Sequence, residues 1–221
     1  MSNNVQLILE LGNNFINVVD PRKGSVKPIE PDSLLSLLSL SNEKVKTRIG
    51  KLPRNTLDVT FEQPGDMKKL LMFVPKGRFN MKALNPDKEY KDIEHPAMLV
   101  LFELKDKTIV NTYIAVLKDI NSMEEIKDNT PVYHWPYVHV SRFHVCWGNT
   151  VLPPIESLHQ LGSIPYLFLD SYHVLNHYGT AQLSNMAMPE LLAALETKTI
   201  ALDDCLKPAD LAYEKFVATY M

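Results

Sequence analysis

Cysteine and histidine side chains lie close together in one short stretch of the sequence, residues 132–149. This stretch holds three of the seven histidines, one of the two cysteines and a single charged side chain, Arg142. A thiol acts as a nucleophile only as the thiolate, so it needs partial exposure and a favourable electrostatic environment. Cys146 closes an expected strand and precedes a Trp-Gly-Asn sequence (147–149), where the glycine allows a sharp turn. Cys146 is therefore the candidate nucleophile.

Histidine and tyrosine side chains are the candidate helpers of this thiol. In an extended strand His144 and Cys146 share one face, because side chains alternate with a period of two. We therefore expect His144 to bias the ionisation of the thiol or to hold a substrate carbonyl. His134 and Tyr137 lie further back and approach only if the chain bends at Pro136. The alternative is a buried, inert Cys146, since free cysteine is among the most buried residue types.

Metal binding is a second chemistry that these residue types allow. His144 and Cys146 offer two ligands from one strand, and His173 and His177 offer two more at positions i and i+4 of one helical face. A zinc-dependent hydrolase is therefore an alternative interpretation. Against it, the sequence has no C-x-x-C pair and no H-E-x-x-H motif, and it lacks the general base expected beside a catalytic zinc.

Composition restricts the class of protein. The chain has 221 residues, 45% of them hydrophobic, and a net charge of −3, which does not favour a nucleic-acid or membrane surface. No apolar run approaches the roughly 20 residues that span a bilayer, and the N-terminal residues do not resemble a signal peptide. Two cysteines make no disulfide framework. We expect a cytoplasmic protein that binds neither nucleic acid nor membrane.

The first fifty or so residues differ from the rest. Val5 to Glu10 and Phe15 to Val19 are short apolar runs separated by a Gly-Asn-Asn turn, a pattern that predicts a hairpin. A helix is expected over the SLLSLLSLS segment, 33–41. The chain then becomes basic and polar, and Pro53 interrupts it. We therefore expect an N-terminal extension over 1–54 and a main domain over 55–221.

The main domain begins with strands and continues with helices. The expected strands are Thr56 to Phe61, Lys69 to Val74, Ala97 to Leu104, Thr108 to Leu117 and Val138 to Cys146. A charged turn at 105–107 joins the Ala97 and Thr108 strands into the strongest hairpin. The expected helices are Ile155 to Leu161, Asp170 to Tyr178, Met188 to Thr199 and a C-terminal one from Pro208. This order predicts an α+β fold, an antiparallel β-meander with flanking helices on one side. Because no glycine-rich phosphate loop is present, nucleotide chemistry is not expected from this chain.

Three short motifs resemble a known family. YHWP (Tyr133 to Pro136), VCWGNTVLP (Val145 to Pro153) and YLFLDSYHVLNH (Tyr166 to His177) are similar to elements of the prokaryotic family D of ubiquitin-conjugating-enzyme-like proteins, also called PRTRC system protein B. The resemblance lies within about residues 95–180. It implies a ubiquitin-conjugating-enzyme-like fold, in which the hairpin of Ala97 to Leu117 belongs to the meander before the catalytic turn.

The resemblance also implies a function. Cys146 would accept the C-terminal carboxyl group of a ubiquitin-like protein as a thioester, delivered by a ThiF-like adenylating enzyme, and an amine would then attack that thioester. No cofactor is implied. A JAB-type protease from the same operon is a further implied partner. A catalytically inactive binding module of the same fold is the alternative from a different class.

One departure from the eukaryotic pattern affects the oxyanion donor. The eukaryotic enzymes have a His-Pro-Asn element before the cysteine, whereas this chain has His134-Trp135-Pro136-Tyr137. The backbone amides of 147–149, Asn149, His144 or Tyr137 are the candidate replacements. Trp147 and Gly148 are candidates for positioning the substrate or acceptor. Ser171, His173 and His177 either cover the cysteine or position an acceptor, or they tie the helix to the sheet.

Overall fold

The chain divides into two compact units, Met1–Arg48 and Ile49–Met221. The computed structural model describes residues 50–62, 67–84, 87–175, 183–184 and 186–221, and the backbone of 6–8, 16–20 and 25–29. No helix among these described residues is long and apolar enough to cross a membrane.

The first unit contains a three-stranded antiparallel sheet of order β1-β2-β3. Its strands are β1 (Gln6–Ile8), β2 (Ile16–Asp20) and β3 (Ser25–Ile29). The predicted hairpin is confirmed, because β1 pairs antiparallel with β2. β3 was not expected, since it contains Pro28, but it lies at the edge of the sheet, where a residue without an N–H group is tolerated. The helix predicted over 33–41 falls outside the described residues.

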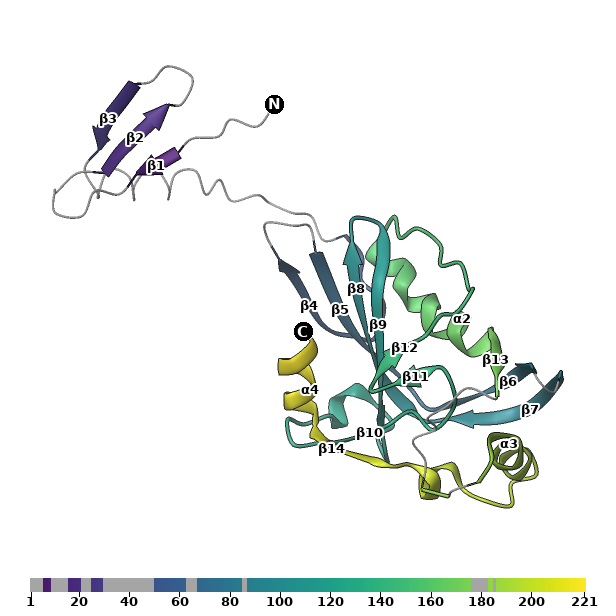
Figure 1. Cartoon of the computed structure of the whole chain (residues 1–221). Coiled ribbons are helices and arrows are strands. Elements are labelled where there is room, and N and C mark those ends of the chain that lie inside the picture. Colours follow the sequence, from purple (N-terminus) through teal and green to yellow (C-terminus); the bar gives the residue numbers. More distant parts are fainter. Residues whose placement is uncertain are drawn as a thin grey trace. The chain divides into compact units, whose positions relative to one another are not determined.

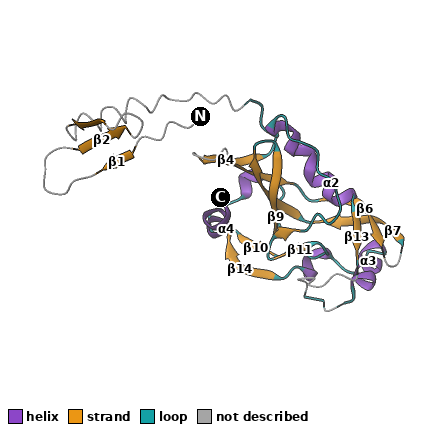
Figure 2. Ribbon diagram, turned by 45° about the horizontal axis from the view of Figure 1, so that its top comes forward, coloured by secondary structure: helices purple, strands orange, loops and turns teal. Residues whose placement is uncertain are grey.

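The second unit is built on an eight-stranded antiparallel sheet. The path through it is β11-β12-β9-β8-β5-β4, and β10 joins β9 to β14. Figure 2 shows these strands in the middle of the unit with the helices around them. The strands are β4 (Thr56–Glu62), β5 (Met67–Val74), β8 (Ala97–Lys105), β9 (Thr108–Leu117), β10 (Pro131–Tyr133), β11 (Val140–Ser141), β12 (His144–Val145) and β14 (Pro208–Ala212). The β8–β9 hairpin and the strands at β4 and β5 are confirmed.

Both faces of the central strands are buried, which explains their unbroken apolar sequences. Along β5, Leu70 and Met72 face one hydrophobic cluster, whereas Leu71 and Phe73 face another. Helix α2 (Ile164–Asp170) belongs to the first cluster and α4 (Tyr213–Tyr220) to the second, and Figure 1 shows them on opposite sides of the sheet. Helices therefore cover two faces, not the one side that was predicted.

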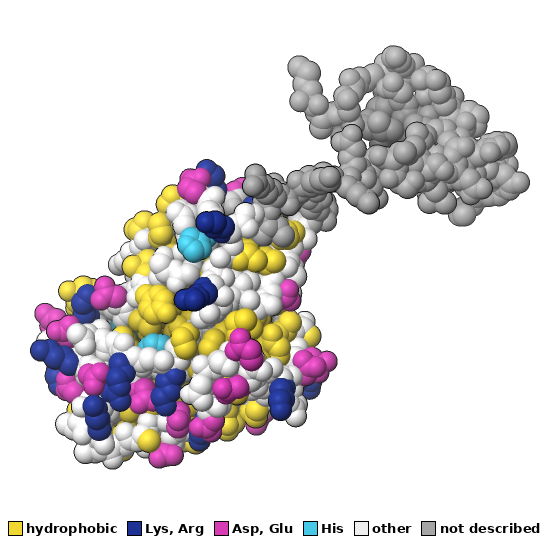
Figure 3. Space-filling model, turned by 180° about the vertical axis from the view of Figure 1, so that it is seen from behind, with side chains coloured by type: hydrophobic (Ala, Val, Ile, Leu, Met, Phe, Trp, Pro, Cys, Tyr) yellow, Lys and Arg dark blue, Asp and Glu magenta, His cyan; other side chains and the backbone are white. Residues whose placement is uncertain are grey.

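A smaller sheet of order β13-β6-β7 completes the unit. It consists of β6 (Gly77–Leu84), β7 (Lys88–His95) and β13 (Tyr172–Val174), the last lying parallel to β6. The sequence analysis missed these strands, because they carry many charged side chains. Phe79, Met81 and Ala83 nevertheless alternate with polar residues as in a half-covered strand. Figure 3 shows that many charged side chains gather over the lower part of one face and that hydrophobic side chains lie above them.

Two predicted helices require correction. A helix was predicted over Asp170 to Tyr178. Helix α2 instead ends at Asp170 and the chain continues as strand β13, so His173 lies on a strand. The C-terminal helix begins at Tyr213, because Pro208–Ala212 pairs with β10 as β14. The other helices of the described residues are α3 (Met188–Glu196), which confirms the prediction there, and the 3₁₀ turns η1 (Met123–Glu125), η2 (Leu158–Ser163) and η3 (Leu202–Cys205).

Candidate functional site

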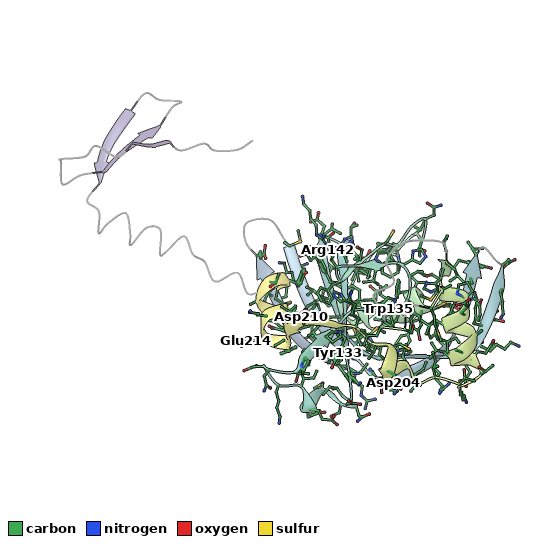
Figure 4. All side chains as sticks on the ribbon, turned by 60° about the horizontal axis from the view of Figure 1, so that its bottom comes forward. Tyr133, Trp135, Arg142, Asp204, Asp210 and Glu214 are labelled. Carbon is green, nitrogen blue, oxygen red and sulfur yellow. The ribbon has the colours of Figure 1, made fainter. Side chains whose placement is uncertain are left out.

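The segment predicted as one strand, Val138 to Cys146, is a tight hairpin. β11 pairs antiparallel with β12, so that Ser141 opposes His144 and only two residues form the turn. Both turn residues have positive backbone φ, 47° at Arg142 and 72° at Phe143, as two-residue hairpin turns require. Arg142, labelled in Figure 4, is exposed. Neither residue is glycine, so the turn is strained and must be held by its surroundings.

An aromatic cluster holds the turn. The Phe143 side chain is only 6% exposed. Its ring stacks on His134, with ring centroids 5.1 Å apart and planes inclined by 19°, and it meets Phe216 of α4 edge to face at 5.4 Å. Burial of an aromatic ring contributes several kcal/mol. This contribution is of the same order as the cost of the turn, about 1–2 kcal/mol for each of its two residues in the left-handed region.

The hairpin delivers Cys146 to the protein surface. Directly after β12, the Cys146 N–H donates to the carbonyl oxygen of His139 at 2.7 Å. The Cys146 side chain is exposed and the thiol is free. The chain then turns back, since the Thr150 N–H donates to the Trp147 carbonyl oxygen at 3.0 Å, and Gly148 at the first central position has φ of 55°. A glycine accepts this conformation without steric cost.

Cys146 lines a cleft of about 460 Å³. The cleft lies between the 146–150 turn, the end of α2, strand β13 and the end of β6. None of its lining residues is Asp, Glu, Lys or Arg. They are Leu84, His139, Cys146, Trp147, Gly148, Asn149, Thr150, Leu167, Phe168, Ser171, Tyr172 and Val174. Cys146 thus shares its cleft with uncharged polar, apolar and aromatic groups.

His139 is a cleft residue that the sequence analysis missed. Its Nε2 accepts a hydrogen bond from the Val174 N–H at 2.9 Å, so that nitrogen is unprotonated and a neutral ring carries its proton on Nδ1. The backbone φ of His139 is 68°. In a continuous strand its odd spacing would put it on the face opposite Cys146. The hairpin instead places the His139 backbone against that of Cys146. Only a prediction of the turn at residues 142–143 could have revealed this neighbour from the sequence.

His173 lies behind the cleft wall. Its ring centroid is 5.5 Å from that of His139, and its side chain is fully buried. Neither ring nitrogen has a hydrogen-bond partner of good geometry among the described residues. The pKa of His173 is lowered to about 4, chiefly by burial and also by the nearby His139, while backbone groups of Leu169 and Phe168 act in the opposite direction. His173 is therefore a neutral imidazole at neutral pH.

His144 does not line the cleft. Its Nε2 lies 3.2 Å from Oδ1 of Asn111 on β9, and its ring meets Tyr113 edge to face at 5.5 Å. The Asn111 amide nitrogen donates to Glu103 at 2.6 Å. The Asn111 oxygen must therefore accept from His144, whose Nε2 carries the proton. The expected pairing of His144 with Cys146 assumed one extended strand, but β12 ends at Val145.

Tyr137 and His134 also lie away from the cleft. Tyr137 is fully buried and its hydroxyl donates to the carbonyl oxygen of Glu94. Burial raises the pKa of Tyr137 well above its ordinary value. His134 is half-buried against Phe143; burial lowers its pKa, and the charge of Lys207 acts in the same direction. Tyr137 meets Trp135, which is labelled in Figure 4, edge to face, whereas His134 packs against Phe143; neither residue lines the cleft with Cys146.

Four of the other predicted residues do line the cleft with Cys146, namely Trp147, Gly148, Asn149 and Ser171. The Trp147 Nε1 donates to the Thr112 hydroxyl at 3.1 Å, and the Ser171 hydroxyl donates to the Phe168 carbonyl oxygen at 2.7 Å. These bonds fix the indole and the end of α2. His177 falls outside the described residues.

A metal centre finds no support in the described part of the chain. Among those residues no group of three or more His, Cys, Asp and Glu side chains has the geometry to hold an ion. The prediction that His173 lies on a helix, where it would share one face with His177, is wrong, because His173 lies on strand β13.

The site thus combines an exposed thiol, a neutral imidazole, a primary amide and hydroxyl groups in an uncharged cleft. No protein-family model, curated protein or solved structure matches the chain.

Proposed function

We propose that the second unit is a ubiquitin-conjugating-enzyme-like carrier that holds the C-terminal acyl group of a ubiquitin-like protein on Cys146. The observation that carries this proposal is the position of the Cys146 thiol, exposed and lining a cleft of about 460 Å³. A carrier needs a thiol that two different proteins can reach in turn. The antiparallel strands before the cysteine and the helices after it are compatible with such a fold.

The proposed reaction is two successive acyl exchanges. The Cys146 thiolate attacks the thioester carbonyl presented by a ThiF-like adenylating enzyme; a carbon–sulfur bond forms as the bond to the donor sulfur breaks, and the donor leaves as a thiolate. An amine then attacks the Cys146 thioester. An amide bond forms, the Cys146 thiolate leaves, and the amine nitrogen loses its proton to solvent or to a neighbouring base.

The cleft wall supports this chemistry in two ways. The lining contains no charged side chain that would compete with the incoming amine, and it limits the access of water to the thioester. Asn149 supplies the side-chain amide that lines the cleft with Cys146 and can donate to the developing oxyanion. Tyr137 and His144, the other predicted donors, are engaged with Glu94 and Asn111.

Reconstitution tests the proposal directly. The full chain is mixed with a ThiF-like adenylating enzyme, its ubiquitin-like protein and ATP, and adducts are separated on gels with and without reductant. We expect a reductant-sensitive adduct on the wild-type chain, none on Cys146→Ala, and a reductant-resistant oxyester on Cys146→Ser. Cys205→Ala is the matched control, because Cys205 is buried and the adduct should persist. An adduct that survives in Cys146→Ala contradicts the proposal.

A non-catalytic binding module is the second candidate function. It is favoured by the bond from the Val174 N–H to His139 Nε2, which occupies the nitrogen that could act as a base near the thiol. Alkylation of the native protein by iodoacetamide distinguishes the carrier from the binding module. A thiol that reacts at the rate of a free cysteine or faster supports the carrier, whereas protection of Cys146 by a bound partner without any adduct supports the module.

A further inference from the structure

A second cavity lies on the other side of helix α2 from Cys146. It has a volume of about 560 Å³ and lies between the start of β4, the end of β5, η2 and α2. Tyr166 faces it, whereas the next two residues of α2, Leu167 and Phe168, line the Cys146 cleft. The two linings share no residue. The cavity is lined by Pro53, Arg54, Asn55, Met72, Phe73, Val74, His159, Gln160, Gly162, Ser163 and Tyr166.

The lining of this cavity carries a positive charge and no negative one. Arg54 lines it, and its guanidinium makes no ion pair or hydrogen bond with any described residue. No aspartate or glutamate is among the lining residues. Elsewhere in the unit the cations of Arg78 and Lys82 are neutralised by Asp92 at 3.0 Å and Asp170 at 2.7 Å. A guanidinium with no partner of its own in a cavity favours a carboxylate or phosphate.

The remaining walls combine apolar and polar groups. Met72 and Val74 are buried and form an apolar floor, while Tyr166 is 54% exposed and presents its ring at the rim. The His159 Nδ1 lies 3.4 Å from the Leu52 carbonyl oxygen and donates to it, which leaves Nε2 as an acceptor. A ligand for these walls therefore has an apolar body and one anionic end.

We propose that this cavity binds a small amphipathic anion, with its carboxylate or phosphate on Arg54 and its apolar body against Met72, Val74 and Tyr166. This site goes beyond the thioester function, because its lining and that of the Cys146 cleft share no residue. Its size and mixed lining are those of a ligand pocket, in which an apolar surface gives affinity and a few polar groups fix the orientation.

The test measures binding of defined probes to the full chain. Hexanoate and hexyl phosphate carry the two candidate head groups, and hexan-1-ol has the same apolar body without charge. Methyl resonances of ¹³C-labelled methionine report binding, since Met72 lines the cavity. Arg54→Gln removes the proposed anion contact, and Lys51→Gln is the matched control, because Lys51 is an exposed cation three residues earlier and outside the lining.

We expect saturable shifts of the Met72 methyl resonance with at least one anion, and weaker binding of hexan-1-ol. Arg54→Gln should weaken anion binding about tenfold or more, and Lys51→Gln should change it less than twofold. The tighter anion identifies the head group. The proposal is overturned if neither anion shifts the Met72 resonance, if hexan-1-ol binds as well as the anions, or if both variants weaken binding equally. Cys146→Ala should leave the binding unchanged, so failure here is separable from failure of the carrier function.

Discussion

His173 is the residue in which burial and ionisation conflict most directly. Its imidazole is fully buried beside His139, and its folded-state pKa of about 4 lies below the ordinary value of 6.5. Between these two values the unfolded chain binds a proton that the folded chain does not. Stability is therefore fully present above pH 6.5 and is lost as the pH falls toward 4. Burial also lowers the pKa of His95 and His134, so their contributions have the same sign.

We predict that acidification destabilises the protein through His173. The shift of its pKa corresponds to about 3 kcal/mol of unfolding free energy lost between pH 6.5 and pH 4. Urea denaturation of wild type and His173→Phe at several pH values measures it. The variant should have a shallower pH dependence across this interval, whatever its stability at pH 8. An equally steep dependence in the variant would place the titrating group elsewhere.

The candidate site could be predicted from the sequence only where neighbours in the chain are also neighbours in space. Trp147, Gly148 and Asn149 follow Cys146 directly and share its cleft. His144 is equally close in the sequence and Tyr137 lies nine positions earlier, yet these two side chains contact Asn111 and Glu94 instead. A turn formed by Arg142 and Phe143 carries none of the Asn or Gly residues that signal a two-residue hairpin, so the local pattern indicated one strand.

At the scale of the element, the β11–β12 hairpin combines strain with packing, and its two turn residues should respond oppositely to substitution. Arg142→Asn should stabilise the unit by up to about 1 kcal/mol, because asparagine tolerates positive φ and Arg142 is exposed. Phe143→Ala should destabilise it by about 3 kcal/mol, since it empties the space beside His134 and Phe216. Chemical denaturation measures both. A loss of stability in Arg142→Asn would mean that its turn is unstrained.

The elements that the sequence predicted well are those with strong local patterns. β5, β8 and β9 each contain an unbroken run of five or more apolar or aromatic residues, because two hydrophobic clusters cover them. β13 was mistaken for helix because its three residues, Tyr172–Val174, gain their conformation from pairing with β6, about ninety positions earlier. Long-range pairing of this kind leaves no periodic signal within the segment.

At the scale of the whole molecule, the division at residues 48 and 49 predicts that the second unit folds alone. Among the side chains that the structure describes, this unit has two hydrophobic clusters of its own, one on each face of the main sheet. A fragment of residues 49–221 should unfold cooperatively, with a midpoint within about 5 °C of that transition in the full chain. Thermal circular dichroism of the two proteins measures this. A fragment without a cooperative transition would show that residues 1–48 are needed for folding.

The two tryptophans of the chain lie in contrasting places. Trp135 is 1% exposed, whereas Trp147 is half-buried and adjoins Cys146 in the chain and in the cleft. Indole fluorescence depends on the polarity and the quenchers around the ring. Emission from Trp147 therefore follows what occupies the neighbouring sulfur, over a constant background from Trp135. The protein carries an intrinsic optical reporter, so occupancy of its thiol can be followed in real time without an added dye.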